Sequence, residues 1–371
     1  MYLTAGLHRS LQRHPDKIAL VDGHCRLSFG QLHARVARLA AALQQLGVQP
    51  GDRIAVLAHN SARYVETTLA VWWCGATLNP VNTRWSLAEI TYALNDCAAR
   101  VLLVDDAFTA PAHDEVPQAA SLCATVHLGH APTPEGLHSY EALIDAATPV
   151  EDARPSADAL AAILYTSGTT GFPKGVMLSH HNFWSSSVGR TAEVPNPSDF
   201  VTLLIAPLFH VAGLGRLIGQ LIVGGTCVTL PAFRPDTVLH TIQEEGITDM
   251  VMVPSMVQML LDTPTFGQHD LSSLRRILWG AAPMALPLLE RALAALPHVE
   301  FIHAYGMTET AASVSVHRIG QAPEERRGEC IRSAGRAGYA TEIRVADPEG
   351  REVPTGDAGE ILVRGPVVMV G

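Results

Sequence analysis

Apolar residues along this chain alternate between helical spacing and short uninterrupted runs. Residues 28–47 predict one helix, in which Ser28 and Gln31 have the spacing of a capping box and Gly47 is suited to close the helix. Apolar side chains return at helical spacing between them. The run RIAVLA at 53–58 predicts a buried strand instead.

The same alternation continues to about residue 303. Further helices are predicted at 62–74, 86–97, from 179 onward, and at 208–223, 235–245, 254–261 and 284–295. Further strands are predicted at 101–104, 161–165, 201–205, 226–230, 249–253, 276–279 and 299–303. Because strands alternate with helices, the sequence predicts an α/β fold: two packed α/β subdomains with mostly parallel sheets.

Two stretches have a different character. Residues 108–155 predict an irregular connection around one strand and one short helix. After about Ile331, short β-like runs separated by turn signals predict a small β-barrel or meander. We therefore expect one domain over 1–371, with a first α/β part (1–160), a second α/β part (161–330) and a β-barrel part (331–371).

Composition and charge exclude a general nucleic-acid surface. The 371 residues are 47% hydrophobic and 17% charged, as in globular proteins, and the formal net charge is -10 with no basic run. Neutralising nucleic-acid phosphates requires clustered Lys and Arg. We expect no nucleic-acid partner, although one local loop can still bind a small anion.

The cysteines and the apolar runs favour a cytoplasmic protein. The six cysteines are scattered without a CxxC pair, which argues against a disulfide or zinc framework and fits a reducing cytosol. None of the 17 histidines has HExxH-like spacing, so a zinc site is not expected. The N-terminus lacks a signal-peptide core, and the longest apolar run, 214–230, is interrupted by Arg216 and Gln220. We predict no integral membrane segment.

The stretch LYTSGTTGFPKGV at 164–176 carries the first chemical signal. Its glycines allow backbone N–H groups to converge, while its hydroxyls and Lys174 add donors that suit phosphate oxygens. The pattern GxxxxGK[ST] of P-loop enzymes is not met, because Gly168 and Gly171 are too close and Lys174 follows Pro. On composition alone, a solvated turn is an equal alternative.

This stretch closely resembles the phosphate-binding signature of the adenylate-forming (AMP-binding) enzymes, which include acyl-CoA synthetases, firefly-type luciferases and nonribosomal adenylation domains. Further words agree in order and spacing, so that the resemblance covers essentially the whole chain and favours the acyl-CoA synthetase, or fatty-acid–CoA ligase, type. They are LSFGQL, Asn79-Pro80-Val81-Asn82-Thr83-Arg84, Gly280-Ala281-Ala282-Pro283, Tyr305-Gly306-Met307-Thr308-Glu309-Thr310, Gly335-Arg336 and Gly359-Glu360-Ile361.

The YGMTET word fits a nucleotide site on physical grounds as well. It follows a buried strand, and open α/β sheets bind ligands where their strands end. Tyr305 offers a flat face for a base, Thr308 a hydroxyl for a phosphate, and Glu309 a hard oxygen for Mg²⁺. Taken alone, a turn with a solvated Glu would be the better interpretation, but the phosphate loop reverses that preference.

The resemblance implies a set of site residues. The catalytic set is Lys174, Thr166, Glu309 and His210, and Mg²⁺ is shared by Thr166 and Glu309. The ATP and AMP set is Thr166, Ser167, Gly168, Thr169, Thr170, Gly171, Lys174, Gly280, Ala281, Ala282, Tyr305, Gly306 and Thr308. The acyl-pocket set is Phe209, His210, Gly213, Trp279, Met307 and Ala312.

The word Pro207-Leu208-Phe209-His210 bears on the substrate. A lone His beside apolar residues is more often a core His, but acyl-CoA synthetases carry a similar word where the pocket holds the carboxylate end of the acid. Amino-acid-activating members usually have an Asp in this region, and this chain has no acid nearby. We therefore expect an acid with an apolar tail, fatty or aryl. Arg216 in the following helix is either solvated or in contact with a polar group of the acid.

The resemblance implies two half-reactions. A carboxylate attacks the α-phosphorus of MgATP to give an acyl-adenylate and pyrophosphate, and a thiol, normally that of CoA, then displaces AMP. The expected partners are a small carboxylic acid, ATP and CoA, with Mg²⁺ as the metal. A ligase that loads a carrier protein, and a non-catalytic nucleotide-binding domain, stay open as alternatives, as does the oligomeric state, a homodimer included.

The family continues past the last words found here into a ribose-binding Asp, a hinge and a small mobile C-terminal domain with a catalytic Lys. Thr355-Gly356-Asp357 precedes the GEI word, so we interpret it as a turn and not as the ribose-binding motif. The sequence is therefore interpreted as the large N-terminal domain alone, and we expect it to adenylate poorly by itself.

Overall fold

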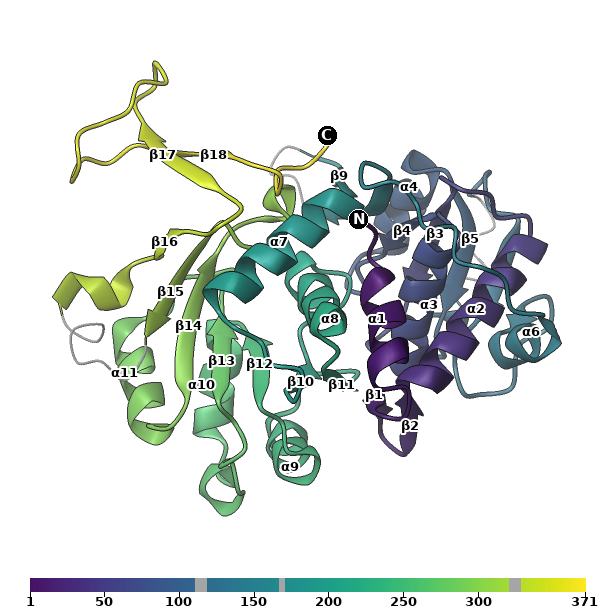
Figure 1. The fold of residues 1–371 in the computed structure, drawn as a ribbon, viewed down its shortest axis with the longest axis horizontal. Coiled ribbons are helices and arrows are strands. Elements are labelled where there is room, and N and C mark those ends of the chain that lie inside the picture. Colours follow the sequence, from purple (N-terminus) through teal and green to yellow (C-terminus); the bar gives the residue numbers. More distant parts are fainter. Residues whose placement is uncertain (111–118, 167–170, 320–327) are drawn as a thin grey trace.

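Two large β-sheets organise the molecule, with helices between them and on their outer faces (Figure 1). The computed structural model describes residues 1–110, 119–166, 171–319 and 328–371. The α/β class with mostly parallel sheets, predicted from the alternating pattern, is confirmed.

The first sheet has seven strands in the order β7-β6-β5-β3-β4-β8-β9. All its neighbouring strands are parallel except the edge hairpin β8–β9. The strands are β3 (Arg53–Leu57), β4 (Thr77–Pro80), β5 (Ala99–Val104), β6 (Ala124–His127), β7 (His138–Ser139), β8 (Leu160–Thr166) and β9 (Lys174–Ser179).

The second sheet has nine strands in the order β16-β15-β14-β13-β12-β10-β11-β1-β2. Its centre is parallel, and antiparallel pairs lie at both edges. The strands are β1 (Ile18–Asp22), β2 (Cys25–Ser28), β10 (Val201–Leu204), β11 (Thr226–Thr229), β12 (Asp249–Met252), β13 (Arg276–Trp279), β14 (Glu300–Tyr305), β15 (Ser315–Ile319) and β16 (Arg336–Ala337).

The helices form three layers around these sheets. The largest core cluster joins α1, α2, α3, α7 and α8 with strands of both sheets, so these helices form a shared middle layer. A second cluster packs α9, α10 and α11 on the outer face of the nine-stranded sheet, and a third packs α4 on the outer face of the other (Figure 1). The helices are α1 (Ala5–Arg13), α2 (Phe29–Gln45), α3 (Ala62–Trp73), α4 (Leu87–Asp96), α6 (Tyr140–Ala146), α7 (His180–Glu193), α8 (Val211–Val223), α9 (Pro235–Glu245), α10 (Pro254–Asp262) and α11 (Leu286–Ala295), with short 3₁₀ turns η2 (Phe266–Gln268), η3 (Thr308–Thr310) and η5 (Gly328–Arg332).

Local sequence signals account for several helix ends. The predicted capping box at Ser28 and Gln31 is confirmed, since each residue bonds the other's backbone N–H at the start of α2. Gly47 follows the end of that helix with φ +90°, a conformation that glycine adopts without a steric penalty. Helix α8 begins at Val211, three residues later than predicted, because His210 in extended backbone is its N-cap.

The division of the chain into three parts by residue number stays a prediction. The sheets do not follow it, because each large sheet contains strands from both sides of residue 160. Strands β1 and β2 join the nine-stranded sheet, while β8 and β9 close the seven-stranded one. Where we expected a small β-barrel, the structure shows a two-stranded antiparallel sheet of β17 (Glu342–Ala346) and β18 (Glu360–Arg364), extended from the body (Figure 1).

The part of the chain that the structure describes contains no helix long and apolar enough to cross a membrane.

Candidate functional site

The β8–β9 hairpin carries two of the predicted catalytic residues. Thr166, the last residue of β8, pairs directly with Lys174, the first residue of β9. Lys174 is exposed and Thr166 is partly buried. Gly171 lies between the strands with φ +139°, a backbone that a side chain rarely adopts. The predicted phosphate-binding residues Ser167, Gly168, Thr169 and Thr170 lie outside the described residues.

Helix α4 holds both flanks of this hairpin connection. The Phe172 ring stacks on Tyr92 with ring centroids 4.8 Å apart, although Phe172 is 71% exposed. On the other flank, the Tyr165 hydroxyl donates to Asp96 Oδ2 at 2.5 Å. Helix α4 therefore holds the described residues on both sides of 167–170.

The YGMTET word forms the turn from β14 into η3, and the last residues of the chain join it to the hairpin. The Met369 N–H donates to the Glu309 carbonyl at 2.8 Å, and the Val370 N–H donates to the Met177 carbonyl of β9 at 2.9 Å. Glu309 therefore lies on an element that neighbours the strand of Lys174.

Thr166 and Glu309 offer donors of the type that Mg²⁺ prefers. A hydroxyl and a carboxylate are hard oxygen ligands, and Mg²⁺ is commonly bound by one or two such groups together with substrate phosphates. Within the described residues, neither side chain is engaged in a hydrogen bond or ion pair. No group of three or more His, Cys, Asp or Glu gathers there that could hold a metal alone. The residues fit a metal held jointly with nucleotide phosphates.

Residues 280–282 follow β13, and Tyr305 ends the neighbouring parallel strand β14, so both lie at one sheet edge. A β-carbon on Gly280 would lie 2.5 Å from the Ala304 carbonyl oxygen, so the glycine permits a close backbone approach. Ala281 and Ala282 are exposed, and Tyr305 is 39% exposed. These surfaces offer a base a flat aromatic face and accessible backbone groups.

The backbone is strained around this edge. Five described residues other than glycine have positive φ, and three of them are Ala281, Ala311 and Ala312. Such conformations cost about 1–3 kcal/mol each and persist where the surroundings enforce them, often at ligand sites. Gly306 is also sterically required, because a β-carbon there would lie 1.8 Å from the Ala312 carbonyl oxygen.

Helix α8 and the residues just before it form the wall predicted for the acid. Phe209 is buried, and its ring lies against His210 with centroids 4.6 Å apart. Gly213 lets α8 approach the Pro207 carbonyl, and a β-carbon on Gly215 would lie 3.6 Å from the Ala312 side chain. Phe209, His210, Gly213 and Ala312 are therefore gathered around the start of α8, whereas Met307 is 55% exposed at the rim.

Trp279 forms a flat pair with His303, a residue that the sequence did not single out. Their rings stack at 4.9 Å with an interplanar angle of 3°, because the two residues pair across β13 and β14. Trp279 is 2% exposed, and its Nε1–H has no acceptor among the described residues. Trp279 belongs to the cluster that covers the outer face of the nine-stranded sheet, whereas the start of α8 belongs to the middle layer, so its place in the acyl pocket stays a prediction.

His210 lies close to a cation that the sequence analysis quoted without a role. Partial burial lowers the pKa of His210, and the positive charge of Arg84 lowers it further. Arg84 belongs to the word at 79–84, so its spacing from His210 in sequence gave no sign of this proximity. The neutral imidazole beside a guanidinium can donate to or accept from a carboxylate without adding a second charge.

Arg216 is neither solvated nor open to the start of α8. It is 4% exposed and forms an ion pair with Asp249 of β12, supported by contacts with Thr202, Asn196 and Gln220. The prediction of a solvated Arg216 is therefore wrong, since the hydrophobic middle layer encloses the side chain and only a buried carboxylate can neutralise it.

Several known proteins are similar to this chain. The family model of the AMP-binding enzyme matches residues 7–371. The chain is 38% identical to a feruloyl-CoA synthase of Amycolatopsis sp over 98% of its own length and 70% of that protein's. It is 34% identical to ScoC, a fatty acid–[acyl-carrier-protein] ligase of Streptomyces coeruleorubidus, over 97% of its own length and 68% of that protein's. Among solved structures, the anthranilate CoA ligase AuaEII in complex with anthranoyl-AMP is similar with a TM-score of 0.92 and 28% identity, covering 100% of this chain and 71% of that one.

Proposed function

Since the chain belongs to the AMP-binding enzyme family, we propose that its adenylation site lies where the β8–β9 hairpin of one sheet meets the ends of β13 and β14 of the other. The chain is a ligase of the AMP-forming acid–CoA type: it activates a carboxylic acid with ATP and passes the acyl group to CoA. We further propose which residues perform the reaction and which acid the chain activates.

In the first half-reaction, a carboxylate oxygen attacks the α-phosphorus of ATP. A new P–O bond to the acid forms as the bond to pyrophosphate breaks, so no proton transfer is needed. Two anions meet, and positive groups must offset the charge that grows on the phosphoryl oxygens. Lys174 and the hydroxyl of Thr308 would supply part of this stabilisation. Mg²⁺, when held by Thr166 and Glu309 with the phosphates, adds charge neutralisation.

In the second half-reaction, the CoA sulfur attacks the acyl carbon and AMP leaves with the oxygen that joined it to the acyl group. The thiol loses its proton as the thioester forms. Before that, in the first half-reaction, His210 would orient the carboxylate of the acid at the start of α8, where the helix N-terminus favours negative charge. Arg84 would strengthen this effect as a second positive group.

The acid that this pocket favours is aromatic. The observation that carries this choice is the Phe209 ring against His210 at the start of α8, because an aromatic face binds a flat ring better than a flexible chain. No acidic side chain adjoins His210 in sequence, which argues against an amino acid. The relatives named for ferulate and anthranilate support the aryl reading, and a fatty acid is the second candidate because of the ScoC relative.

Carboxylate-dependent ATP–pyrophosphate exchange by the full-length protein tests the proposal. We expect exchange with cinnamate-type or benzoate-type acids at a kcat/KM at least about tenfold above that with fatty acids of similar size, and none with amino acids. Preferred exchange with amino acids would overturn the role given to His210. Calorimetric titration of MgATP separates the remaining alternative, because an inert nucleotide-binding domain would bind without exchange.

The acceptor is tested with the same acid. CoA, or a phosphopantetheinylated carrier protein, is added to enzyme that holds the acyl-adenylate, and release of AMP is followed. Faster release with CoA supports the proposed reaction, and faster release with the carrier protein supports the ScoC-like one. The proposed location is the cytoplasm, on the strength of the unpaired cysteines.

A further inference from the structure

Each large sheet has one point at which successive connections leave in opposite directions. In the seven-stranded sheet, β3 has β4 on one side and β5 on the other. In the nine-stranded sheet, β10 has β11 on one side and β12 on the other. Open α/β sheets bind ligands outside the carboxyl ends of their strands at such switch points. The residues that follow β3 and β10 are therefore the places to look for further parts of the site.

The side chain of Asn60 joins these two points. Asn60 follows β3 and is 5% exposed. Its Nδ2 donates to the carbonyls of Leu204 and Ala206, both at 3.0 Å, and its Oδ1 accepts from the Leu208 N–H at 2.8 Å. Leu204 is the last residue of β10. One amide of the seven-stranded sheet thus holds the chain where it leaves the nine-stranded sheet.

The three backbone groups that Asn60 bonds require an amide. Two of them are acceptors and one is a donor, and a primary amide offers two N–H donors and an oxygen acceptor. An ionised aspartate of the same shape offers acceptors alone. Because Asn60 is buried, a backbone group that lost its partner would be left unsatisfied, which is costly.

The segment that Asn60 holds leads directly into His210. The His210 N–H donates to the Pro207 carbonyl at 3.0 Å. The first turn of α8 packs on the same segment, because a β-carbon on Gly213 would collide with the Pro207 carbonyl and lie 2.6 Å from the Ala206 carbonyl oxygen. The backbone before His210 is thus held both by the Asn60 amide and by close contact with α8.

A second residue of the seven-stranded sheet also acts on His210. Burial lowers the pKa of His210, and the positive charge of Arg84 lowers it further. Arg84 lies in the connection that follows β4, the neighbour of β3. The carboxyl edge of the seven-stranded sheet therefore approaches the start of α8 at two residues, Asn60 and Arg84.

We propose that Asn60 is a positioning residue of the acid site, which acts through His210 and sets the affinity for the carboxylate of the acid. The proposal rests on the proposed function and adds to it a contribution from the switch point of the seven-stranded sheet. Thr166 and Lys174 lie on the β8–β9 hairpin and not on the segment that Asn60 holds. Loss of the Asn60 amide should therefore weaken the use of the acid far more than the use of ATP.

Pyrophosphate exchange by the full-length protein, with the acid and ATP varied in turn, tests this proposal. Asn60→Asp keeps the shape of the side chain but removes both N–H donors. We expect KM for the acid to rise by about 10-fold to 100-fold, since a displacement of about 1 Å in a positioned group has effects of this order. KM for ATP should change by less than about threefold. Asn60→Ala should act in the same direction, and it supplies the same test if Asn60→Asp does not fold.

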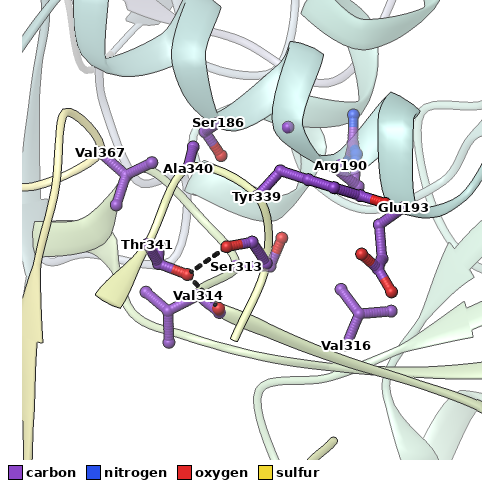
Figure 2. Close-up of a pocket in the computed structure, with 12 residues that line it drawn as sticks. Ser186, Arg190, Glu193, Ser313, Val314, Val316, Tyr339, Ala340, Thr341 and Val367 are labelled. Atoms are coloured by element: carbon purple, nitrogen blue, oxygen red, sulfur yellow. Dashed lines mark hydrogen bonds between the residues drawn. The ribbon is translucent and has the colours of Figure 1, made fainter. Parts of the chain in front are cut away.

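Asn196→Ala is the matched control. Asn196 is a second buried amide, 7% exposed, and donates to Gln220 Oε1 at 2.8 Å near the other end of α8. It follows the end of α7 that carries Arg190 and Glu193 (Figure 2). This variant should lower the melting temperature, as Asn60→Ala does, but leave KM for the acid within about threefold of its original value.

A double-mutant cycle with His210→Gln separates positioning from a general loss of structure. If Asn60 acts through the imidazole, Asn60→Asp should raise KM for the acid by less than about threefold once His210 is replaced. The same increase with and without His210, equal effects on acid and ATP, or an equal effect of Asn196→Ala would overturn the proposal. If no acid supports exchange in the unaltered protein, the proposed function fails; if exchange occurs and KM for the acid is normal in the Asn60 variants, this inference fails alone.

Discussion

Thr166 and Lys174 face one another because a hairpin brings its two ends together, whatever lies between them. The pairing fixes one hydroxyl and one ammonium at the same edge, and the final residues of the chain tie Glu309 to it. At the scale of single residues, the candidate catalytic groups are thus the ammonium of Lys174, the hydroxyl of Thr166 and the carboxylate of Glu309. Each can be removed separately with little effect on the core, because none of the three is buried.

Replacing the ammonium tests its proposed role directly. Lys174→Gln is expected to lower kcat/KM for exchange by about 10² to 10³, because a preorganised donor to the developing phosphoryl charge is lost. The free energy of unfolding should change by less than about 0.5 kcal/mol, since Lys174 is exposed. Urea unfolding checks this second point. Arg38→Gln, another exposed cation, is the control and should exchange normally.

Removing the Glu309 carboxylate should change the magnesium dependence of the exchange reaction. Glu309→Gln keeps the shape of the side chain but removes its charge, and a hard divalent cation loses a charged ligand. We expect the Mg²⁺ concentration needed for half-maximal exchange to rise by about tenfold or more, with stability little altered. A magnesium titration at fixed ATP measures this. An unchanged magnesium requirement, with only the maximal rate reduced, would remove Glu309 from the metal site.

At the scale of elements, the segment from the end of β14 through η3 to Ala312 is the most constrained piece of the site. Ala311 and Ala312, which follow η3, have positive φ, and Gly306 faces the Ala312 carbonyl at a distance that no side chain can occupy. The element therefore has one conformation compatible with its packing, and that conformation presents Tyr305 and Glu309 together. A substitution in this segment should therefore weaken ATP binding even when the Tyr305 and Glu309 side chains are unchanged.

Gly306→Ala tests this coupling. The added β-carbon must displace the chain at Ala312, and we expect a loss of about 1–3 kcal/mol in the free energy of unfolding together with weaker ATP binding. Calorimetry at a temperature where the variant is fully folded separates the two effects. Gly267→Ala in η2 is the matched control, because a β-carbon there meets nothing within 4 Å. Equal behaviour of the two variants would contradict the steric argument.

At the scale of the whole molecule, the middle helical layer joins the two sheets and includes the first residues of the chain. The Leu3 N–H donates to Nδ1 of His180, the first residue of α7, at 3.2 Å. His180 is 1% exposed and its Nε2 has no partner among the described residues. Burial lowers the pKa of His180 to about 4, so the imidazole is neutral in the folded protein at pH 7.

This burial predicts acid sensitivity of the whole fold. An unfolded histidine has a pKa near 6.5, so between pH 6.5 and about 4 the unfolded state binds a proton that the folded state does not. Stability is then full above pH 6.5 and falls as the pH drops toward 4, by about 3 kcal/mol for this one group. Urea unfolding across that range should show the slope, and His180→Gln should reduce it. His181→Gln, at the exposed neighbouring position, should leave the slope unchanged.

The sequence by itself determined the alternating elements, the caps and the words that carry the chemistry. These depend on interactions between residues a few positions apart, such as Ser28 with Gln31, and periodicity records such interactions directly. It also indicated strand ends within two residues of Thr166 and Tyr305, because buried runs stop where polar motifs begin. The phosphate loop itself stays a prediction at Ser167, Gly168, Thr169 and Thr170.

The tertiary structure alone decided which distant residues share a neighbourhood. Pairing of β13 with β14 set His303 on Trp279, and packing of α7 against α8 brought Arg190 near Arg216. It also decided that β1 pairs with β11, more than 200 positions further along the chain, and brings β2 into the nine-stranded sheet. Such contacts depend on the order of strands in the sheet and on which carboxylate lies next to a buried arginine. Neither quantity leaves a periodic trace in the sequence, because the residues concerned are separated by tens or hundreds of positions.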